Sequence, residues 1–152
     1  LDFEMEDEAL SKQLSVAFLE RLPHKKNLFP YTIEILEYLT SRGYVLHLVT
    51  NGFEQVQHRK LANCNLRAYF QEVITSEASN SLKPNRAIFA YALARSGAAV
   101  HESIMIGDNL DADIQGGRNA GLDTVFVNHL NIPVPIEPTY TVHHLRELEN
   151  IF

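Results

Sequence analysis

Apolar side chains recur every three or four residues over several stretches of the chain, which predicts helices with one apolar face. Residues 6–22 form the first such stretch, and we expect its apolar face to be buried and Pro23 to end it. Pro30 opens a second helical pattern, which Gly43 terminates as a left-handed cap. Further helices are predicted at residues 53–66, from Asn85 to Gly97, at 112–120 before Gly121, and at 143–152.

Between these helices lie short apolar runs, rich in β-branched residues, that lack a long polar face. Such runs are typical of strands covered on both sides. They lie at residues 44–49, 72–75, 103–106, 124–127 and 140–142. Residues 76–82 are expected to be a loop, and residues 131–138, which hold three of the six prolines, an ordered loop or the edge of a lid. The alternation predicts an α/β fold, a parallel sheet with helices on both faces, and in such sheets ligands bind at the carboxyl ends of the strands.

Composition narrows the class of protein. A chain of 152 residues with 45% apolar side chains and no apolar run of membrane-spanning length is typical of one globular domain without a membrane partner. The net charge of −6 argues against a nucleic acid polymer as partner, because that needs clustered Lys and Arg, but it permits a small anionic ligand. Cys64 is the only cysteine and residues 1–8 do not resemble a signal peptide, so a cytoplasmic location is expected.

Thr50, Asn51 and Gly52 follow the first predicted strand. A hydroxyl and successive backbone N–H groups at a helix start can bind a phosphate. Taken alone, the same residues are better explained as a helix cap and a turn.

Lys83 and Asp108 also lie at predicted loop and strand ends. The lysine precedes Pro84, and its ammonium could neutralise a phosphoryl group, although an isolated lysine is usually a solvated surface residue. Asp108 follows a buried strand, and a magnesium site needs few protein carboxylates. Asp111 is better explained by the helix macrodipole, whereas Asp113 is expected to orient ligands or water without binding the metal directly.

Three segments in this order resemble the second, third and fourth motifs of haloacid dehalogenase-type hydrolases. They are LVTNG at 48–52, SLKPN at 81–85 and IGDNLDADIQGGRNAG at 106–121. The resemblance covers essentially the whole chain. It implies a Rossmann-like core domain at residues 28–152, which is incomplete, and the end of a helical cap domain at residues 1–27. The segments TNGF, KPNRAIFAYAL and EPTYTVHHLRELENIF look closest to house-cleaning nucleoside 5′-monophosphate phosphatases.

The resemblance also implies a mechanism and a role for each residue. In the family an aspartate attacks phosphorus, a second aspartate protonates the leaving group, and Mg²⁺ holds the phosphoryl oxygens. By resemblance, Thr50 and the Asn51–Gly52 backbone would bind the phosphoryl group of a small phosphorylated metabolite. Lys83 would stabilise its charge, and Asp108, supported by Asp113, would bind Mg²⁺.

One departure from the family pattern is large, because no DxD motif precedes Thr50. In the family this motif ends the central strand, between the strands that end at Thr50 and at Asp108. We therefore expect the chain to be an inactive fragment of a protein of about 220 to 250 residues, with the nucleophile on a missing N-terminal segment. The alternatives are a non-catalytic binding or regulatory module, which should have repaired its sheet, and a 2-haloacid dehalogenase. A phosphoreceiver domain also uses these three residue types, but in the order aspartate, threonine and lysine, whereas this chain has Thr50, then Lys83, then Asp108.

Overall fold

The structure, a computed structural model, describes residues 7–152, in which parallel strands alternate with helices. The strands are β1 (Leu46–Thr50), β2 (Phe70–Thr75), β3 (Ile104–Gly107), β4 (Asp123–Val127) and β5 (Tyr140–Val142). The α-helices are α1 (Glu8–Arg21), α2 (Thr32–Ser41), α3 (Glu54–Asn63), α4 (Ser76–Ser79), α5 (Arg86–Ser96) and α6 (Gly116–Asn119). No helix among these residues is long and apolar enough to cross a membrane.

The strands form two separate parallel sheets. One contains β1 and β2, with Thr50 opposite Thr75, and the other has the order β3-β4-β5, with Gly107 opposite Phe126. Within residues 7–152, β1 and β3 are therefore each hydrogen-bonded along one edge only. Unpaired N–H and C=O groups in a buried sheet are costly, so the free edges of β1 and β3 mark where the sheet is interrupted.

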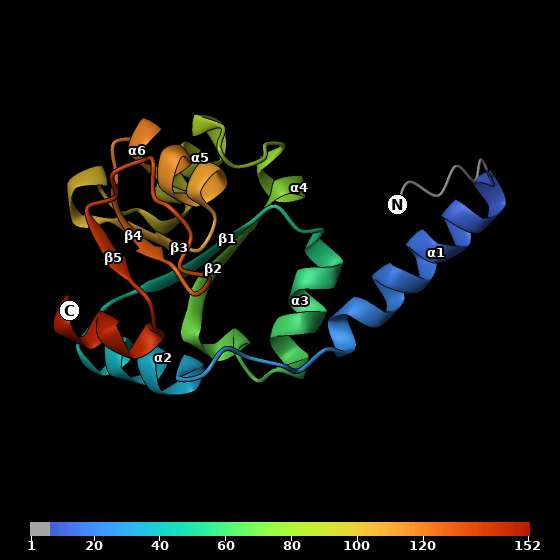
Figure 1. Cartoon of the computed structure of the whole chain (residues 1–152), viewed down its shortest axis with the longest axis horizontal. Coiled ribbons are helices and arrows are strands. Elements are labelled where there is room, and N and C mark those ends of the chain that lie inside the picture. Colours follow the sequence, from blue (N-terminus) through green and yellow to red (C-terminus); the bar gives the residue numbers. More distant parts are fainter. Residues whose placement is uncertain (1–6) are drawn as a thin grey trace.

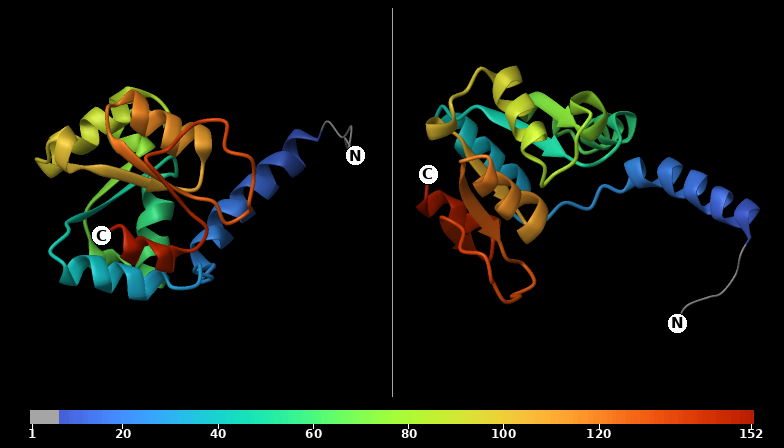
Figure 2. Two further views of the ribbon diagram at one scale, coloured as in Figure 1. Left: turned by 60° about the vertical axis from the view of Figure 1, so that its left-hand side comes forward. Right: turned by 90° about the horizontal axis from the view of Figure 1, so that it is seen from above.

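Helices cover both faces of the strands, as the alternation predicted (Figures 1 and 2). On one face α2 and the C-terminal 3₁₀ segment Leu145–Asn150 pack against β4 and β5, and α5 covers β2 on the other. The first core cluster is Ile35, Leu39, Val125, Val127, Val142 and Leu148, and the second is Ile74, Ile88 and Phe89. Gly43 has a φ of +87°, the left-handed conformation expected of it.

Helix α1 differs from the expectation that one of its faces is buried. The helix begins at Glu8, where the Asp7 carboxylate accepts a hydrogen bond from the Leu10 N–H at 2.9 Å. None of its residues is buried, and Phe18 is 61% exposed. Figure 1 shows α1 projecting from the body of the protein. The prediction of a buried face is wrong over the described residues, because apolar spacing identifies a face but not what covers it. Glu6, the predicted first residue, lies outside the described residues.

Three other elements differ from prediction. The expected loop 76–82 begins with the short helix α4, because the Thr75 hydroxyl accepts a hydrogen bond from the Ala78 N–H at 3.1 Å and caps it. The expected helix 112–120 is divided into a π-helical turn, Leu110–Gln115, and α6. The C-terminal segment is 3₁₀-helical at Leu145–Asn150.

The loop between β4 and β5 is ordered, as its prolines suggested. The Asn128 side chain donates to the Ile132 carbonyl and accepts from the Ile132 N–H, each at 3.0 Å. His129 stacks on Phe29, in the segment before α2, with ring centroids 4.2 Å apart. These contacts fix the loop beside the carboxyl end of β4.

Candidate active site

Thr50 is the last residue of β1, and its hydroxyl faces the turn that follows. The oxygen accepts a hydrogen bond from the Gly52 N–H at 3.1 Å. This contact orients the turn before α3, and it leaves the hydroxyl proton free to be donated to an anion.

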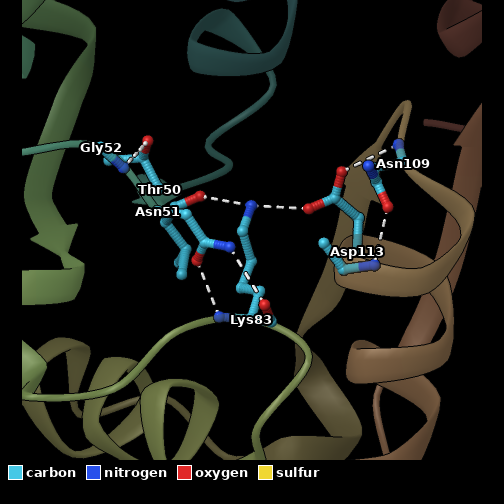
Figure 3. Close-up of polar contacts among 8 residues, drawn as sticks. Thr50, Asn51, Gly52, Lys83, Asn109 and Asp113 are labelled. Atoms are coloured by element: carbon cyan, nitrogen blue, oxygen red, sulfur yellow. Dashed lines mark hydrogen bonds and ion pairs between the residues drawn. The ribbon is translucent and has the colours of Figure 1, made fainter. Parts of the chain in front are cut away.

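Lys83 is a partly buried residue and not the solvated surface lysine of the simplest interpretation. Its ammonium donates to the Val49 carbonyl at 2.8 Å and forms an ion pair with Asp113 Oδ1 at 2.6 Å. The two charged side chains are only 11% and 7% exposed. Figure 3 shows the lysine between the end of β1 and the segment after β3. A positive charge therefore lies in the interruption between the two sheets.

Asp113 is held in place by contacts on both of its oxygens. Oδ1 binds Lys83, and Oδ2 accepts a hydrogen bond from the Asn109 N–H at 3.1 Å. A side chain at Gly107, the last residue of β3, would overlap the Asp113 carboxylate, so this close approach requires glycine. The π-helical turn places Asp113 inward, while Asp111 in the same turn is exposed.

Asp108 lies at the tip of β3 and is exposed. It lines a cavity of about 40 Å³ together with Asn128 and His129. Over residues 7–152 no three Asp, Glu, His or Cys side chains lie close enough together to hold a metal ion. A carboxylate oxygen is nonetheless a ligand that Mg²⁺ prefers, and the ion keeps several waters. The exposed Asp108 carboxylate is suited to provide one ligand of a magnesium ion. Both oxygens of Asp113 already have partners, so Asp113 is suited to hold neighbouring groups in place and not to bind the ion directly.

Three contributions to this site were missed in the sequence. Asn109 caps the π-helical turn, because its side-chain oxygen accepts a hydrogen bond from the Ala112 N–H at 2.8 Å. An asparagine directly before a predicted helix could have indicated this cap. Glu77 accepts the Glu54 N–H at 2.5 Å at the start of α3. No signal predicts that contact, because the two residues are 23 positions apart. The third is the side chain of Asn51, which contacts the backbone of Lys83, whereas the sequence indicates a role only for the Asn51 backbone.

The residues predicted from separate segments therefore gather at one edge of the strands. The Lys83 ammonium joins the Val49 carbonyl, which precedes Thr50 in the chain, to Asp113, whose other oxygen accepts from the Asn109 N–H (Figure 3). Asp108 directly precedes Asn109 in the chain. A hydroxyl donor and a buried cation beside an exposed carboxylate suit the binding of a small anion together with a hard metal ion.

A family model described as haloacid dehalogenase-like hydrolase matches residues 3–127 of the chain. The chain belongs to this family. Its relatives include the pyrimidine 5′-nucleotidase YjjG of Escherichia coli, 35% identical over 142 residues, which are 91% of this chain and 63% of YjjG. The pyrimidine 5′-nucleotidase PynA of Streptococcus pneumoniae is 39% identical over 119 residues, or 76% of this chain and 50% of PynA. Others are sugar phosphatases, such as the glyceraldehyde 3-phosphate phosphatase of Methanothermobacter thermautotrophicus, 39% identical over 66% of this chain and 44% of that protein.

Solved structures agree with this assignment. The putative hydrolase YfnB of Bacillus subtilis, solved bound to magnesium, has a TM-score of 0.88 at 31% identity, over 96% of this chain and 64% of YfnB. A phosphatase of the family from Thermococcus onnurineus has a TM-score of 0.82 at 37% identity, over 89% of this chain and 62% of that protein. The chain spans half to just under two-thirds of the two nucleotidases. Its relatives in this hydrolase family include nucleotidases and sugar phosphatases.

Proposed function

We propose that the protein containing this chain is a magnesium-dependent phosphomonoester hydrolase that acts on nucleoside 5′-monophosphates through an aspartyl-phosphate intermediate. The observation that carries the proposal is the buried Lys83 ammonium at the interruption between β1 and β3. A cation in that position suits a phosphoryl group and an attacking carboxylate at the same point. The names of two relatives, both pyrimidine 5′-nucleotidases, support the choice of substrate.

The nucleophile is proposed to come from a segment N-terminal to this chain. The free edges of β1 and β3 offer hydrogen-bonding groups for one further strand, and Lys83 lies between the strand ends where the tip of such a strand would come. A carboxylate at that tip would lie near the lysine. On the same proposal, residues before 28 belong to a helical cap, whose remaining helices would cover the exposed apolar side chains of α1.

Each residue of the site then has a definite task. Thr50 donates its hydroxyl proton to a phosphoryl oxygen, and the Asn51–Gly52 backbone lies beside the same anion. Lys83 offsets the negative charge that the phosphoryl group and the carboxylate bring together, in a site of low exposure where charge interactions are strong. Asp108 would hold Mg²⁺, and Asp113 keeps Lys83 and the backbone at Asn109 in place. The ion, when bound, supplies further positive charge to the phosphoryl oxygens.

The test is hydrolysis by the full-length protein. Release of phosphate should be measured from pyrimidine and purine nucleoside 5′-monophosphates and from glyceraldehyde 3-phosphate, with Mg²⁺ and with a chelator in its place. We expect Mg²⁺-dependent release, fastest with a nucleotide, and no turnover by residues 1–152 alone. Faster hydrolysis of the sugar phosphate would support the proposed reaction but show that the proposed substrate class is wrong.

Two outcomes would replace the proposal. Halide release from 2-chloropropionate without phosphate release would favour a dehalogenase, to whose fold the chain is also similar: a 2-haloacid dehalogenase of Pseudomonas syringae has a TM-score of 0.78 at 26% identity. Absence of any turnover, together with absence of an upstream DxD motif in the full-length sequence, would favour a binding module.

A further inference from the structure

The side chain of Asn51 makes two hydrogen bonds to the backbone of a single distant residue. Its Oδ1 accepts from the Lys83 N–H at 2.7 Å, and its Nδ2 donates to the Lys83 carbonyl at 3.0 Å. One amide thus satisfies both backbone groups of a residue 32 positions away (Figure 3). The Asn128 amide pairs with Ile132 in the same way, but over four residues, where it only closes a loop.

Lys83 is fixed to the end of β1 at two points, of which the Asn51 amide is one. The Lys83 ammonium is held by the carbonyl of Val49, and its backbone is held by Asn51, two residues further along the same segment. Thr50 lies between these two anchors. A lysine side chain has several rotatable bonds and loses much rotamer freedom when it is ordered. Because the Lys83 backbone is already fixed, the ammonium contacts have less conformational freedom to restrain. The spacing between the Thr50 hydroxyl and the Lys83 ammonium is therefore set within one short segment.

We infer that the Asn51 side chain is a positioning residue, which holds Lys83 in register with Thr50 so that ammonium and hydroxyl meet the same phosphoryl group. The inference rests on the proposed function for its catalytic consequence. It requires an amide, because the side chain must accept from the N–H and donate to the carbonyl. Aspartate has nearly the same shape but would set an oxygen against the Lys83 carbonyl.

The first measurement does not depend on activity. Amide hydrogen exchange at Lys83, followed by NMR in the full-length protein, reports whether its N–H is held. In Asn51→Ala we expect exchange to be faster by roughly tenfold, the factor for one hydrogen bond. The matched control is Asn85→Ala in the same segment, which removes the cap that Asn85 Oδ1 gives to the Ala87 N–H at 2.9 Å and leaves the Asn51 contacts in place. Equal exchange at Lys83 in Asn51→Ala and wild type would overturn the inference.

The second measurement is turnover of the full-length protein. Asn51→Ala and Asn51→Asp should both lower kcat, by up to about 100-fold, the loss typical of a catalytic group displaced by about 1 Å, while KM changes less. Asn85→Ala should stay within about twofold of wild type, since surface changes of this kind act mainly on stability. A wild-type kcat in Asn51→Asp would show that the amide donor is not needed and would also overturn the inference.

The two measurements separate this inference from the proposed function. If the full-length protein hydrolyses no phosphomonoester, the proposed function fails, and the exchange rate at Lys83 alone decides whether Asn51 positions the lysine. If hydrolysis occurs and kcat is the same in Asn51→Ala as in wild type, the proposed function stands and the role of Asn51 fails.

Discussion

Replacing Lys83 by methionine removes a buried cation while keeping a side chain of similar length. The variant loses the ion pair with Asp113 and the hydrogen bond to the Val49 carbonyl. Asp113, whose side chain is 7% exposed in the wild type, keeps the Asn109 N–H as its remaining partner among the described residues. We expect a large loss of stability, because an uncompensated buried charge is more costly than a missing contact.

The magnitude follows from the geometry. Two unit charges 2.6 Å apart attract by about 6 kcal/mol at an effective dielectric constant of about 20. Desolvation of both groups offsets much of this attraction, and breaking a buried pair typically costs about 3 to 5 kcal/mol. That is a large part of a usual unfolding free energy of about 5 to 15 kcal/mol. Lys83→Met combined with Asp113→Asn should regain more than half of the loss, because the orphaned charge is gone and the asparagine still accepts from the Asn109 N–H.

The assay is urea unfolding of the full-length protein at pH 7, followed by circular dichroism, with the unfolding free energy obtained by linear extrapolation. Lys26→Met, at an exposed lysine, is the matched control and should stay within about 0.5 kcal/mol of wild type. High salt should change the Lys83→Met loss little, since a buried pair is weakly screened. A loss below about 1 kcal/mol, or a double variant less stable than Lys83→Met alone, would refute the reasoning.

Three further predictions concern the surroundings of the lysine. Asp108→Asn should abolish Mg²⁺-dependent turnover of the full-length protein and change its unfolding free energy by less than about 0.5 kcal/mol, because the residue is exposed; turnover that survives would remove Asp108 from the metal site. Gly107→Ala should cost about 1 to 3 kcal/mol in urea unfolding, since the added methyl overlaps Asp113, and full stability would contradict this. Burial lowers the pKa of His47, opposed in part by Glu72, so the folded state takes up a proton less readily than the unfolded one. Stability should then decline as the pH falls below about 6.5, and less steeply in His47→Leu; parallel pH curves for the two proteins would show that His47 does not contribute.

The order of strands and helices could be predicted because the spacing of apolar residues and the positions of Gly and Pro agree along most of the chain. Gly43 and Gly97 end their helices in the left-handed conformation, and the predicted strands lie within one or two residues of those observed. Resemblance to the family also predicted that β1 and β3 lack a shared neighbour, and each is paired along one edge only over residues 7–152. The exposure of the apolar face of α1 could not be predicted, because burial depends on what packs against the helix and not on the helix's own sequence.

The sequence predicted which residues belong to the candidate site, but not the contacts between them. Thr50 and Asp108 could be placed at one edge because parallel strands deliver their carboxyl ends there, and Lys83 was added to them by its place before Pro84 and by resemblance to the family's third motif. The ion pair between Lys83 and Asp113 depends on a π-helical turn, which has no clear sequence signal. The contacts of Asn51 join residues too far apart in sequence for local patterns to reveal them.

The single ammonium that joins the tips of β1 and β3 has a thermodynamic consequence. Over residues 7–152 no backbone ladder joins the two sheets, and the ammonium contacts the Val49 carbonyl on one side and Asp113 on the other. An anion that binds the ammonium therefore competes with Asp113 for it. By reciprocity, any change that weakens the contact between Lys83 and Asp113 must raise the affinity for the anion by the same factor by which the anion weakens that contact.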